Sequence, residues 1–217
     1  SALTAADALK LEDAVRVVRV RADAMQAAVP VGTGGMAAVL GLSDEAVKAV
    51  CQQAAQGEIV EAVNFNAPAQ VVIAGHKAAV ERACELAKAA GAKRALVLPV
   101  SAPFHSSLLK PAALVLERAL ADIALQTPAI PLVNNVDVQS PSEPAAIKDA
   151  LVRQAWHSVR WVETIQAMKA QGVTHVVECG PGKVLNGLTK RIDGDLVGLA
   201  ISDPASLESA LETLQGN

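Results

Sequence analysis

The chain has 217 residues, of which 52% are hydrophobic and 19% are charged, a composition typical of a globular protein rather than a disordered one. It contains two Phe, two Trp and no Tyr, and its net charge is −3. Aromatic rings that could stack on bases are therefore nearly absent, and there is no positive field that could attract phosphates, so we expect no nucleic-acid partner.

The cysteines, the histidines and the apolar segments exclude further classes. Cys51, Cys84 and Cys179 are odd in number and widely spaced, which argues against a disulfide framework and against a cysteine zinc site. The four histidines show no spacing typical of metal ligands. No apolar run approaches membrane-spanning length and no secretory signal is present. We therefore expect a cytoplasmic protein with no metal site and no membrane partner.

Residues 12–29 give the first strong helix signal, because their apolar side chains recur at alternating spacings of three and four. The predicted apolar stripe consists of Val15, Val18, Ala22 and Met25. Arg21 is the most informative charge on this helix, since its neighbours three and four positions away are all apolar. It could be a snorkelling arginine, or one paired with a distant carboxylate. Alternatively, its planar guanidinium could bind an anionic ligand through two parallel hydrogen bonds.

Residues 32–99 alternate between strand and helix signals. The expected elements are strand 36–42, helix 43–55 with Ser43 as N-cap, strands 58–65 and 70–75, helix 77–91 and strand 94–100. The order strand–helix–strand–strand–helix–strand is that of the split βαβ, ferredoxin-like pattern. We therefore predict a small subdomain at residues 32–99.

The remaining residues, 1–31 and 100–217, are predicted to form an α/β core on either side of that subdomain. The expected elements after the subdomain are helix 106–126, a buried strand at 130–136, helical segments within 143–170, strand 174–180, helix 183–191, strand 197–202 and helix 204–214.

His105 follows an apolar run and a Pro-Phe step, a position suited to a general base. Many histidines beside apolar strands are structural, so this pattern alone leaves both roles open. Ser106 and Ser107 begin a predicted helix, and we expect their hydroxyls to point away from the imidazole.

Six stretches of the chain carry a family resemblance. In chain order they are VRADAMQAAVPVGTGGMAAVLGL, VNFNAPAQVVIAGH, GAKRALVLPVSAPFHSSLLKPAA, VNNVD, ALVRQ and ECGPGKVLNGLTKR. Together they resemble the malonyl-CoA:acyl carrier protein transacylases of bacterial fatty acid synthesis, and the resemblance extends over essentially all 217 residues.

The resemblance implies a ping-pong acyl transfer. A serine attacks the thioester of malonyl-CoA with a histidine as base, and the malonyl group then passes to the phosphopantetheine thiol of acyl carrier protein. By this resemblance His105 is the catalytic histidine, and Arg21 binds the malonyl carboxylate. The main-chain carbonyl of Gln154 fixes the tautomer of the histidine. The resemblance associates a phenylalanine before the catalytic histidine, here Phe104, with malonyl rather than branched extender units. The remaining implied pocket residues are Met25, Asn64 and Gln70.

The resemblance also implies the fold and the partners. The fold would be a partial α/β-hydrolase-like core at residues 1–31 and 100–217, with an inserted ferredoxin-like (βαββαβ) subdomain at 32–99. The partners would be malonyl-CoA and acyl carrier protein. No resident cofactor or metal is implied, and we expect the complete enzyme to be a monomer.

One departure from the family is large. The G-H-S-x-G elbow that carries the nucleophilic serine and the G-Q-G turn that helps form the oxyanion hole do not occur in the 217 residues. Ser1-Ala2-Leu3 resembles the residues that follow the elbow. We therefore expect this chain alone to be inactive and marginally stable, since part of the central sheet would be missing. Two alternatives remain open: an acyltransferase domain of a polyketide synthase, and a non-catalytic module in which Arg21 binds a small carboxylate.

Overall fold

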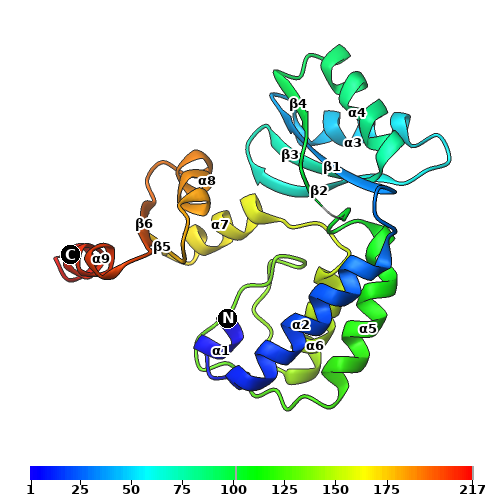
Figure 1. Cartoon of the computed structure of the whole chain (residues 1–217). Helices are drawn as coiled ribbons and strands as arrows, with labels where there is room; N and C mark the ends of the chain where they lie inside the picture. The colour runs from blue at the N-terminus through cyan, green and yellow to red at the C-terminus, as the bar shows by residue number, and fades with distance from the viewer. Residues whose placement is uncertain (101, 217) are drawn as a thin grey trace. The chain divides into compact units, whose positions relative to one another are not determined.

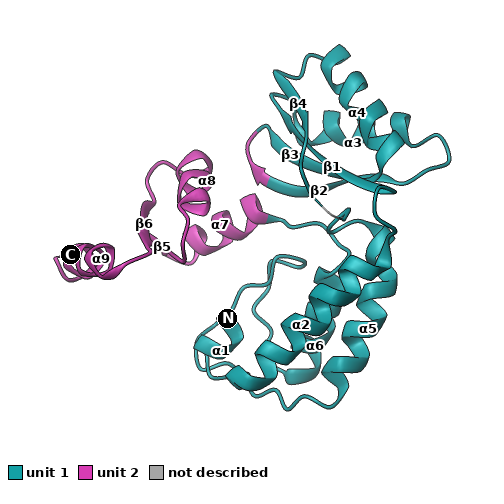
Figure 2. Ribbon diagram, in the orientation of Figure 1, with its two compact units in different colours: residues 1–65, 69–160 teal, residues 66–68, 161–217 magenta. Residues whose placement is uncertain are grey.

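The computed structural model describes residues 1–100 and 102–216, which form two compact units (Figures 1 and 2). One unit contains residues 1–65 and 69–160, and the other contains 66–68 and 161–217. This division differs from the predicted boundaries at 31/32 and 99/100. The predicted subdomain packs with the helices of residues 1–31 and 102–160, because Phe104 contacts apolar clusters on both sides.

A four-stranded sheet forms the first half of the larger unit. Its strands are β1 (Gly34–Leu40), β2 (Val60–Ala67), β3 (Gln70–His76) and β4 (Arg94–Val97), in the order β2-β3-β1-β4. Strand β1 runs antiparallel to both β3 and β4. Helices α3 (Asp44–Ala55) and α4 (Lys77–Ala89) lie on one face of this sheet (Figure 1). The predicted sequence of strands and helices is therefore present.

Local signals explain where several of these elements begin and end. The Ser43 hydroxyl accepts a hydrogen bond from the Ala46 N–H at 3.2 Å, as predicted for the N-cap of α3. Strand β4 ends at Val97, three residues earlier than predicted, before Pro99, which cannot donate to a strand ladder. The face under α3 and α4 is filled by buried aliphatic side chains, among them Val39, Val47, Val71, Ile73 and Val80.

Helices form the second half of this unit. They are α1 (Ala2–Ala5), α2 (Leu11–Ala28), the 3-10 turn η1 (Ser107–Leu109), α5 (Lys110–Ala121) and α6 (Pro144–Gln154). Helix α2 packs on α5, and α5 packs on α6 (Figure 1). The helix predicted at 106–126 is thus shorter, starting as a 3-10 turn and ending at Ala121.

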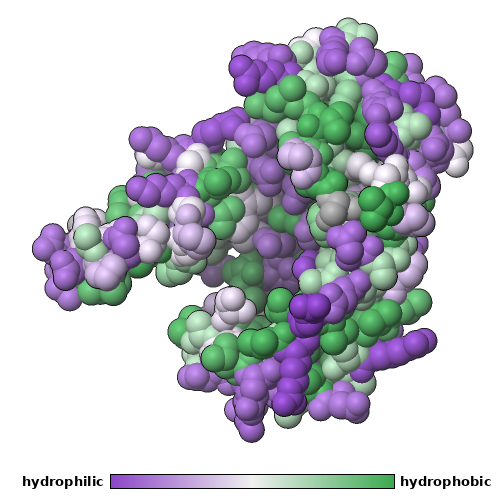
Figure 3. Space-filling model, viewed as in Figure 1, coloured by the Kyte–Doolittle hydropathy of each residue, from purple (hydrophilic) through white to green (hydrophobic). Residues whose placement is uncertain are grey.

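The predicted apolar stripe of α2 is wrong for three of its four members. Val15 and Val18 are 61% and 60% exposed, and Ala22 is also exposed, whereas Met25 is buried. Val17 and Met25 instead pack against α5. Ala14 is buried beside Leu3 of α1 and Ile147 of α6. A helix this rich in Ala and Val is apolar on more than one side, so spacing alone does not identify the buried face. Figure 3 shows green, apolar side chains exposed over α2 and α5.

The strand predicted at residues 130–136 is also wrong, because these residues form a loop. The Asn134 carboxamide oxygen accepts from the N–H groups of Val136 and Asp137, at 3.1 and 2.7 Å. Its NH₂ group donates to the Gln139 carbonyl at 3.1 Å. Asparagine satisfies the backbone locally here and stabilises a turn in place of a strand ladder.

The smaller unit alternates helices with two parallel strands. Its elements are α7 (Trp161–Ala170), β5 (His175–Cys179), α8 (Val184–Ile192), β6 (Val197–Ile201) and α9 (Pro204–Gln215). Strands β5 and β6 pair in parallel from His175 with Val197 to Cys179 with Ile201. Asp203 caps α9 in a capping box with Ser206. Within the described residues, no helix is both long enough and apolar enough to cross a membrane.

Candidate functional site

His105 occupies a strained turn between the sheet and α5. Its φ angle is 64°, in the left-handed region that residues other than glycine rarely adopt. Its ring Nδ1 lies 2.9 Å from the carbonyl oxygen of Gln154, the last residue of α6. A carbonyl can only accept, so this contact favours the neutral tautomer with the proton on Nδ1. The Nε2 atom is then free to accept a proton.

The environment of His105 favours the neutral form of its ring. Burial is the largest influence and lowers the pKa of His105 below its ordinary value. Hydrogen bonding to the backbone of Gln154 and His157 acts in the opposite direction, and the positive charge of Arg21 lowers the pKa further. A neutral imidazole at physiological pH can act as a general base.

Arg21 projects from α2 and is partly buried. Among the residues that the structure describes it makes no hydrogen bond or ion pair, so the expectation of a distant carboxylate partner finds no support. Burial lowers the pKa of Arg21, since its charge is held away from water. An unpaired, partly buried guanidinium is the arrangement expected of a side chain that binds an anion.

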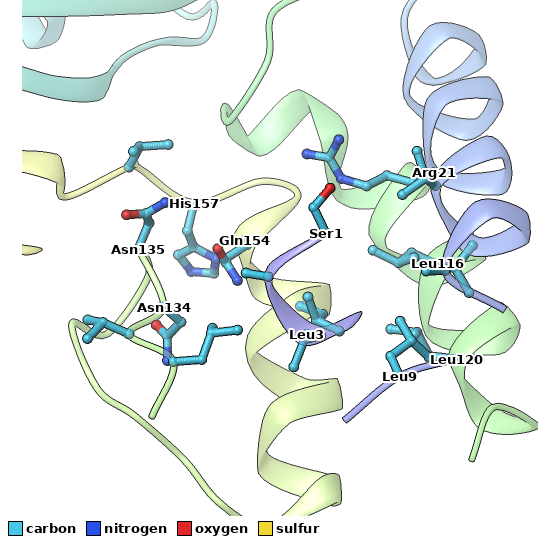
Figure 4. A pocket seen from close by; sticks show the side chains of 18 of the residues that line it. Ser1, Leu3, Leu9, Arg21, Leu116, Leu120, Asn134, Asn135, Gln154 and His157 are labelled. Carbon is cyan, nitrogen blue, oxygen red and sulfur yellow. The ribbon is translucent and has the colours of Figure 1, made fainter. Parts of the chain in front are cut away.

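A pocket of about 460 Å³ brings these groups together (Figure 4). Its polar lining includes Arg21, His105, Gln154 and His157, and its walls are largely aliphatic. In Figure 4 the Arg21 guanidinium points into the pocket above Leu116 and Leu120, and Gln154 and His157 lie across from it. The aliphatic lining residues are Leu3, Leu9, Val17, Val18, Leu116, Leu120, Leu132, Val133, Leu151 and Val159. A cation and a neutral base in an apolar pocket can bind a small carboxylate and take a proton beside it.

A known family profile matches most of the chain. The family profile described as "Acyl transferase domain" matches residues 1–192. The chain belongs to the acyl transferase family. The malonyl CoA-acyl carrier protein transacylase of Salmonella typhimurium is 54% identical over 211 residues, which cover 97% of this chain and 68% of that relative.

Solved structures of relatives share the α/β fold of this acyl transferase chain. An acyl-carrier-protein S-malonyltransferase from Burkholderia pseudomallei is 65% identical with a TM-score of 0.95, over 97% of this chain and 68% of that one. A malonyl-transacylase solved in complex with a type II polyketide synthase acyl-carrier protein is 51% identical with a TM-score of 0.96. That match also covers 97% of this chain and 68% of the relative.

Of the residues expected at the site, Arg21, His105 and Gln154 line the pocket, and four do not. Met25 is only 2% exposed and packs inside the helical core against Val29 and Leu109. Phe104 packs between that core and a second cluster on the sheet. Neither is a lining residue of the pocket.

Asn64 and Gln70 lie on the sheet at unequal distances from His105. Asn64 is next to the pocket, because the Phe65 N–H donates to the carbonyl of Val159, a lining residue, at 3.0 Å. Gln70 pairs with Leu40, at the opposite end of the β1–β3 ladder from Gly34. Gly34 abuts the His105 turn so closely that a Cβ there would lie 2.5 Å from Pro103 Cδ. Gln70 lies six positions along β3 from His76, the partner of Gly34, a distance of about 20 Å.

Neither serine beside His105 is available as a nucleophile. Ser106 is fully buried and its hydroxyl donates to the Pro103 carbonyl at 2.7 Å. The Ser107 hydroxyl donates to the Glu61 carboxylate at 2.8 Å. The structure thus agrees with the expectation that both hydroxyls are directed elsewhere.

Arg153, which holds the loop at residues 130–139, was not singled out from the sequence. Residues 132–135 of this loop line the pocket, and we call it the pocket loop. Arg153 donates to both carboxylate oxygens of Asp137, at 2.6 and 2.7 Å, and its Nε donates to Asp149 at 2.7 Å. The hydrogen bonds from Arg153 hold the pKa of Asp137 below its usual range. The i, i+4 spacing of Asp149 and Arg153 on one helix could have predicted their ion pair. No spacing in the sequence predicts the contact between Arg153 and Asp137, which are 16 residues apart. In the described part of the chain, no three His, Cys, Asp or Glu side chains come together as metal ligands.

Proposed function

We propose that this chain carries the base and the carboxylate-binding site of a malonyl-CoA:acyl carrier protein transacylase. The observation on which the proposal depends is the pocket that Arg21 and His105 both line. Arg21 has no partner there among the described residues, and the Gln154 carbonyl orients the His105 ring. Family membership and relatives named as malonyl transacylases support it.

The proposed mechanism assigns one role to each group. Arg21 binds the malonyl carboxylate through two parallel hydrogen bonds and so orients the thioester. His105 Nε2 takes the proton of a serine hydroxyl as that serine attacks the thioester carbonyl carbon and CoA leaves as its thiol. The Gln154 carbonyl holds the proton of the ring on Nδ1 and stabilises the imidazolium that forms. In the second half-reaction the phosphopantetheine thiol attacks the malonyl-serine ester and regenerates the serine.

The nucleophile is proposed to lie outside residues 1–217, since the family elbow does not occur in them. Ser106 and Ser107, beside the base, are committed to other acceptors. Ser1 and Ser158 line the pocket, but neither lies in the elbow motif. A polypeptide of these residues alone would then be inactive. The reaction moves an acyl group between thioester and ester, so the proposal includes no resident cofactor. Met25 and Phe104 would shape the pocket, and Asn64 and Gln70 would contact the substrate beyond its acyl group.

The proposal extends to the fold class and the partners. The sheet order β2-β3-β1-β4 with α3 and α4 on one face supports a ferredoxin-like subdomain, and the remainder would be part of an α/β-hydrolase-like core. The partners would be malonyl-CoA and acyl carrier protein. The relative solved with a type II polyketide synthase carrier protein favours testing that class of carrier as well.

The test is a transfer assay with a polypeptide that contains these residues together with the serine-bearing segment. Radiolabelled malonyl-CoA is supplied with a fatty-acid or a polyketide carrier protein, and label on the phosphopantetheine arm is measured. We expect transfer from malonyl-CoA and much slower transfer from acetyl-CoA. Binding of malonate without transfer to either carrier would instead favour a carboxylate-binding module.

A further inference from the structure

We infer that Glu61, on strand β2, is a positioning residue that holds the catalytic turn of His105 by capping the helix that follows it. The inference rests on the proposed function, because it assigns Glu61 a role in the reaction of His105. Nothing in the sequence around Glu61 indicates this role, since the contact joins residues 46 apart.

The contact itself is short and double. One carboxylate oxygen of Glu61 accepts from the Ser107 N–H at 2.7 Å, and the other accepts from the Ser107 hydroxyl at 2.8 Å. Both partners are partly buried, which protects the hydrogen bonds from competition by water. Hydrogen bonds to an ionised carboxylate are stronger than those between neutral groups.

The helix that starts at Ser107 needs such a partner. The first N–H groups of a helix have no acceptor within the helix, and neither η1 nor α5 has a local side-chain cap. Glu61 supplies the missing acceptor from a strand of the sheet, and its negative charge lies at the positive end of the helix.

His105 lies two residues before Ser107, and its backbone has a positive φ angle. A residue other than glycine keeps this unfavourable conformation only where contacts from surrounding elements hold it in place. Two contacts from other elements hold this turn: the Gln154 carbonyl on the His105 ring, and Glu61 on Ser107. Strand β2 also hydrogen-bonds on both sides of Asn64 to Val159, five residues after Gln154. One strand therefore fixes both the turn that carries the base and the segment that carries its acceptor.

The experiment compares four variants in the polypeptide used for the transfer assay. Glu61→Ala removes both acceptors, and Glu61→Gln removes the charge but keeps one acceptor oxygen and the side-chain shape. Ser107→Ala removes only the hydroxyl hydrogen bond. Glu58→Ala is the matched control, because the Glu58 carboxylate accepts an equally short hydrogen bond, from Arg82 at 2.7 Å, and among the described residues it has none with the His105 turn. The readouts are kcat, KM for malonyl-CoA, and the pKa of the His105 ring by NMR.

For Glu61→Ala we expect kcat to fall about tenfold, with KM for malonyl-CoA unchanged within about twofold. We expect the pKa of His105 to rise, because a loosened turn admits water and relieves the burial that lowers it. Glu61→Gln should keep kcat within about threefold and leave the pKa of His105 unchanged or slightly lower, since loss of a nearby negative charge disfavours the imidazolium. Glu58→Ala should change neither.

Equal kcat and equal pKa of His105 in the Glu61→Ala and Glu58→Ala variants would overturn the inference. A pKa of His105 that falls alike in Glu61→Ala and Glu61→Gln would also overturn it, because Glu61 would then act through its charge alone. If Glu61→Ala does not fold, Ser107→Ala decides: a raised pKa of His105 supports the inference, and an unchanged one overturns it. If the unmutated polypeptide shows no transfer while the pKa of His105 still rises in Glu61→Ala, the proposed function fails and the positioning contact stands.

Discussion

Replacing Arg21 by alanine tests the pocket most directly, because this side chain has no other partner to lose in the described structure. The matched control is Arg16→Ala on the same helix, where the side chain is 77% exposed and lies 4.0 Å from Asp13. Arg21→Lys is a second comparison, since it keeps the charge but not the planar fork. We expect Arg21→Ala to lower transfer of malonyl far more than transfer of acetyl, which has no carboxylate to bind.

The magnitude follows from the contacts that the pocket offers. The two hydrogen bonds from Arg21 to the malonyl carboxylate would replace hydrogen bonds that the free groups make with water. We take the net gain of the pair as that of one charged hydrogen bond, about 1.5–3 kcal/mol. Because about 1.4 kcal/mol corresponds to a factor of ten, the ratio of kcat/KM for malonyl-CoA to that for acetyl-CoA should fall about tenfold to a hundredfold. Arg21→Lys should lie between Arg21→Ala and the unmutated protein, and Arg16→Ala should leave the ratio unchanged.

The pH dependence of the reaction distinguishes a role of Arg21 in carboxylate binding from a general disruption of the pocket. The charge of Arg21 lowers the pKa of His105, so its removal should raise that pKa. The base must be neutral to act, so the acidic limb of the pH–rate profile should move to higher pH for both acyl donors in Arg21→Ala and less so in Arg21→Lys. The assay is steady-state transfer with each donor across pH 5 to 8. Equal losses of kcat/KM for malonyl-CoA and acetyl-CoA would refute the assignment of Arg21 to the carboxylate.

Three further predictions concern the base, the nucleophile and the pocket loop. His105→Ala should slow serine acylation by about two to four orders of magnitude, while the far-UV circular dichroism stays unchanged; a lost fold would make His105 structural. A polypeptide of residues 1–217 incubated with radiolabelled malonyl-CoA should acquire no covalent label, and stoichiometric label on Ser106 or Ser107 would contradict the proposed origin of the nucleophile. Asp137→Asn should lower the free energy of unfolding at pH 7 by about 1 kcal/mol, once a charged hydrogen-bond pair is discounted for its partial exposure. Because the pKa of Asp137 is lowered in the folded state, this stabilisation is present above the usual aspartate range and disappears on acidification below it, so urea unfolding should show the two proteins converging in acid.

The periodic signals of the chain predicted most helices and strands, because those signals are local. Ser43 caps α3 through a side chain three residues from its partner. The order of strands and helices along residues 34–97 followed from segments that alternate between the strand and helix periods. The loop at 130–136 was mispredicted, since an apolar run becomes a strand only where another strand pairs with it. The sequence cannot show that pairing, and Asn134 provided a local alternative.

The site was predictable to a different extent. The resemblance placed His105 and Gln154 in one site although they are 49 residues apart, and the structure shows their ring-to-carbonyl contact at 2.9 Å. Spacing alone could not have done so. Neither the residue pattern nor the family resemblance predicted the hydrogen bonds between Glu61 and Ser107. In the sequence, a glutamate that caps a distant helix cannot be distinguished from any other partly exposed glutamate in a strand.

The partly buried arginines of the larger unit differ in whether their guanidinium groups have hydrogen-bond acceptors in the described structure. Arg82 donates to the carbonyls of Ala54 and Ala55 and to Glu58, and Arg153 makes three hydrogen bonds to two carboxylates. Arg21 is also partly buried, yet it makes none with the described residues. Partial removal of a guanidinium from water without hydrogen-bond acceptors is unfavourable, and binding of an anion would offset this desolvation free energy. The same positive charge lowers the pKa of His105, so an anion bound to Arg21 would raise the basicity of the neighbouring ring. On the proposed assignment, carboxylate binding and base strength would be coupled in this pocket: a malonyl donor bound to Arg21 would make His105 a stronger base, and an acetyl donor would not.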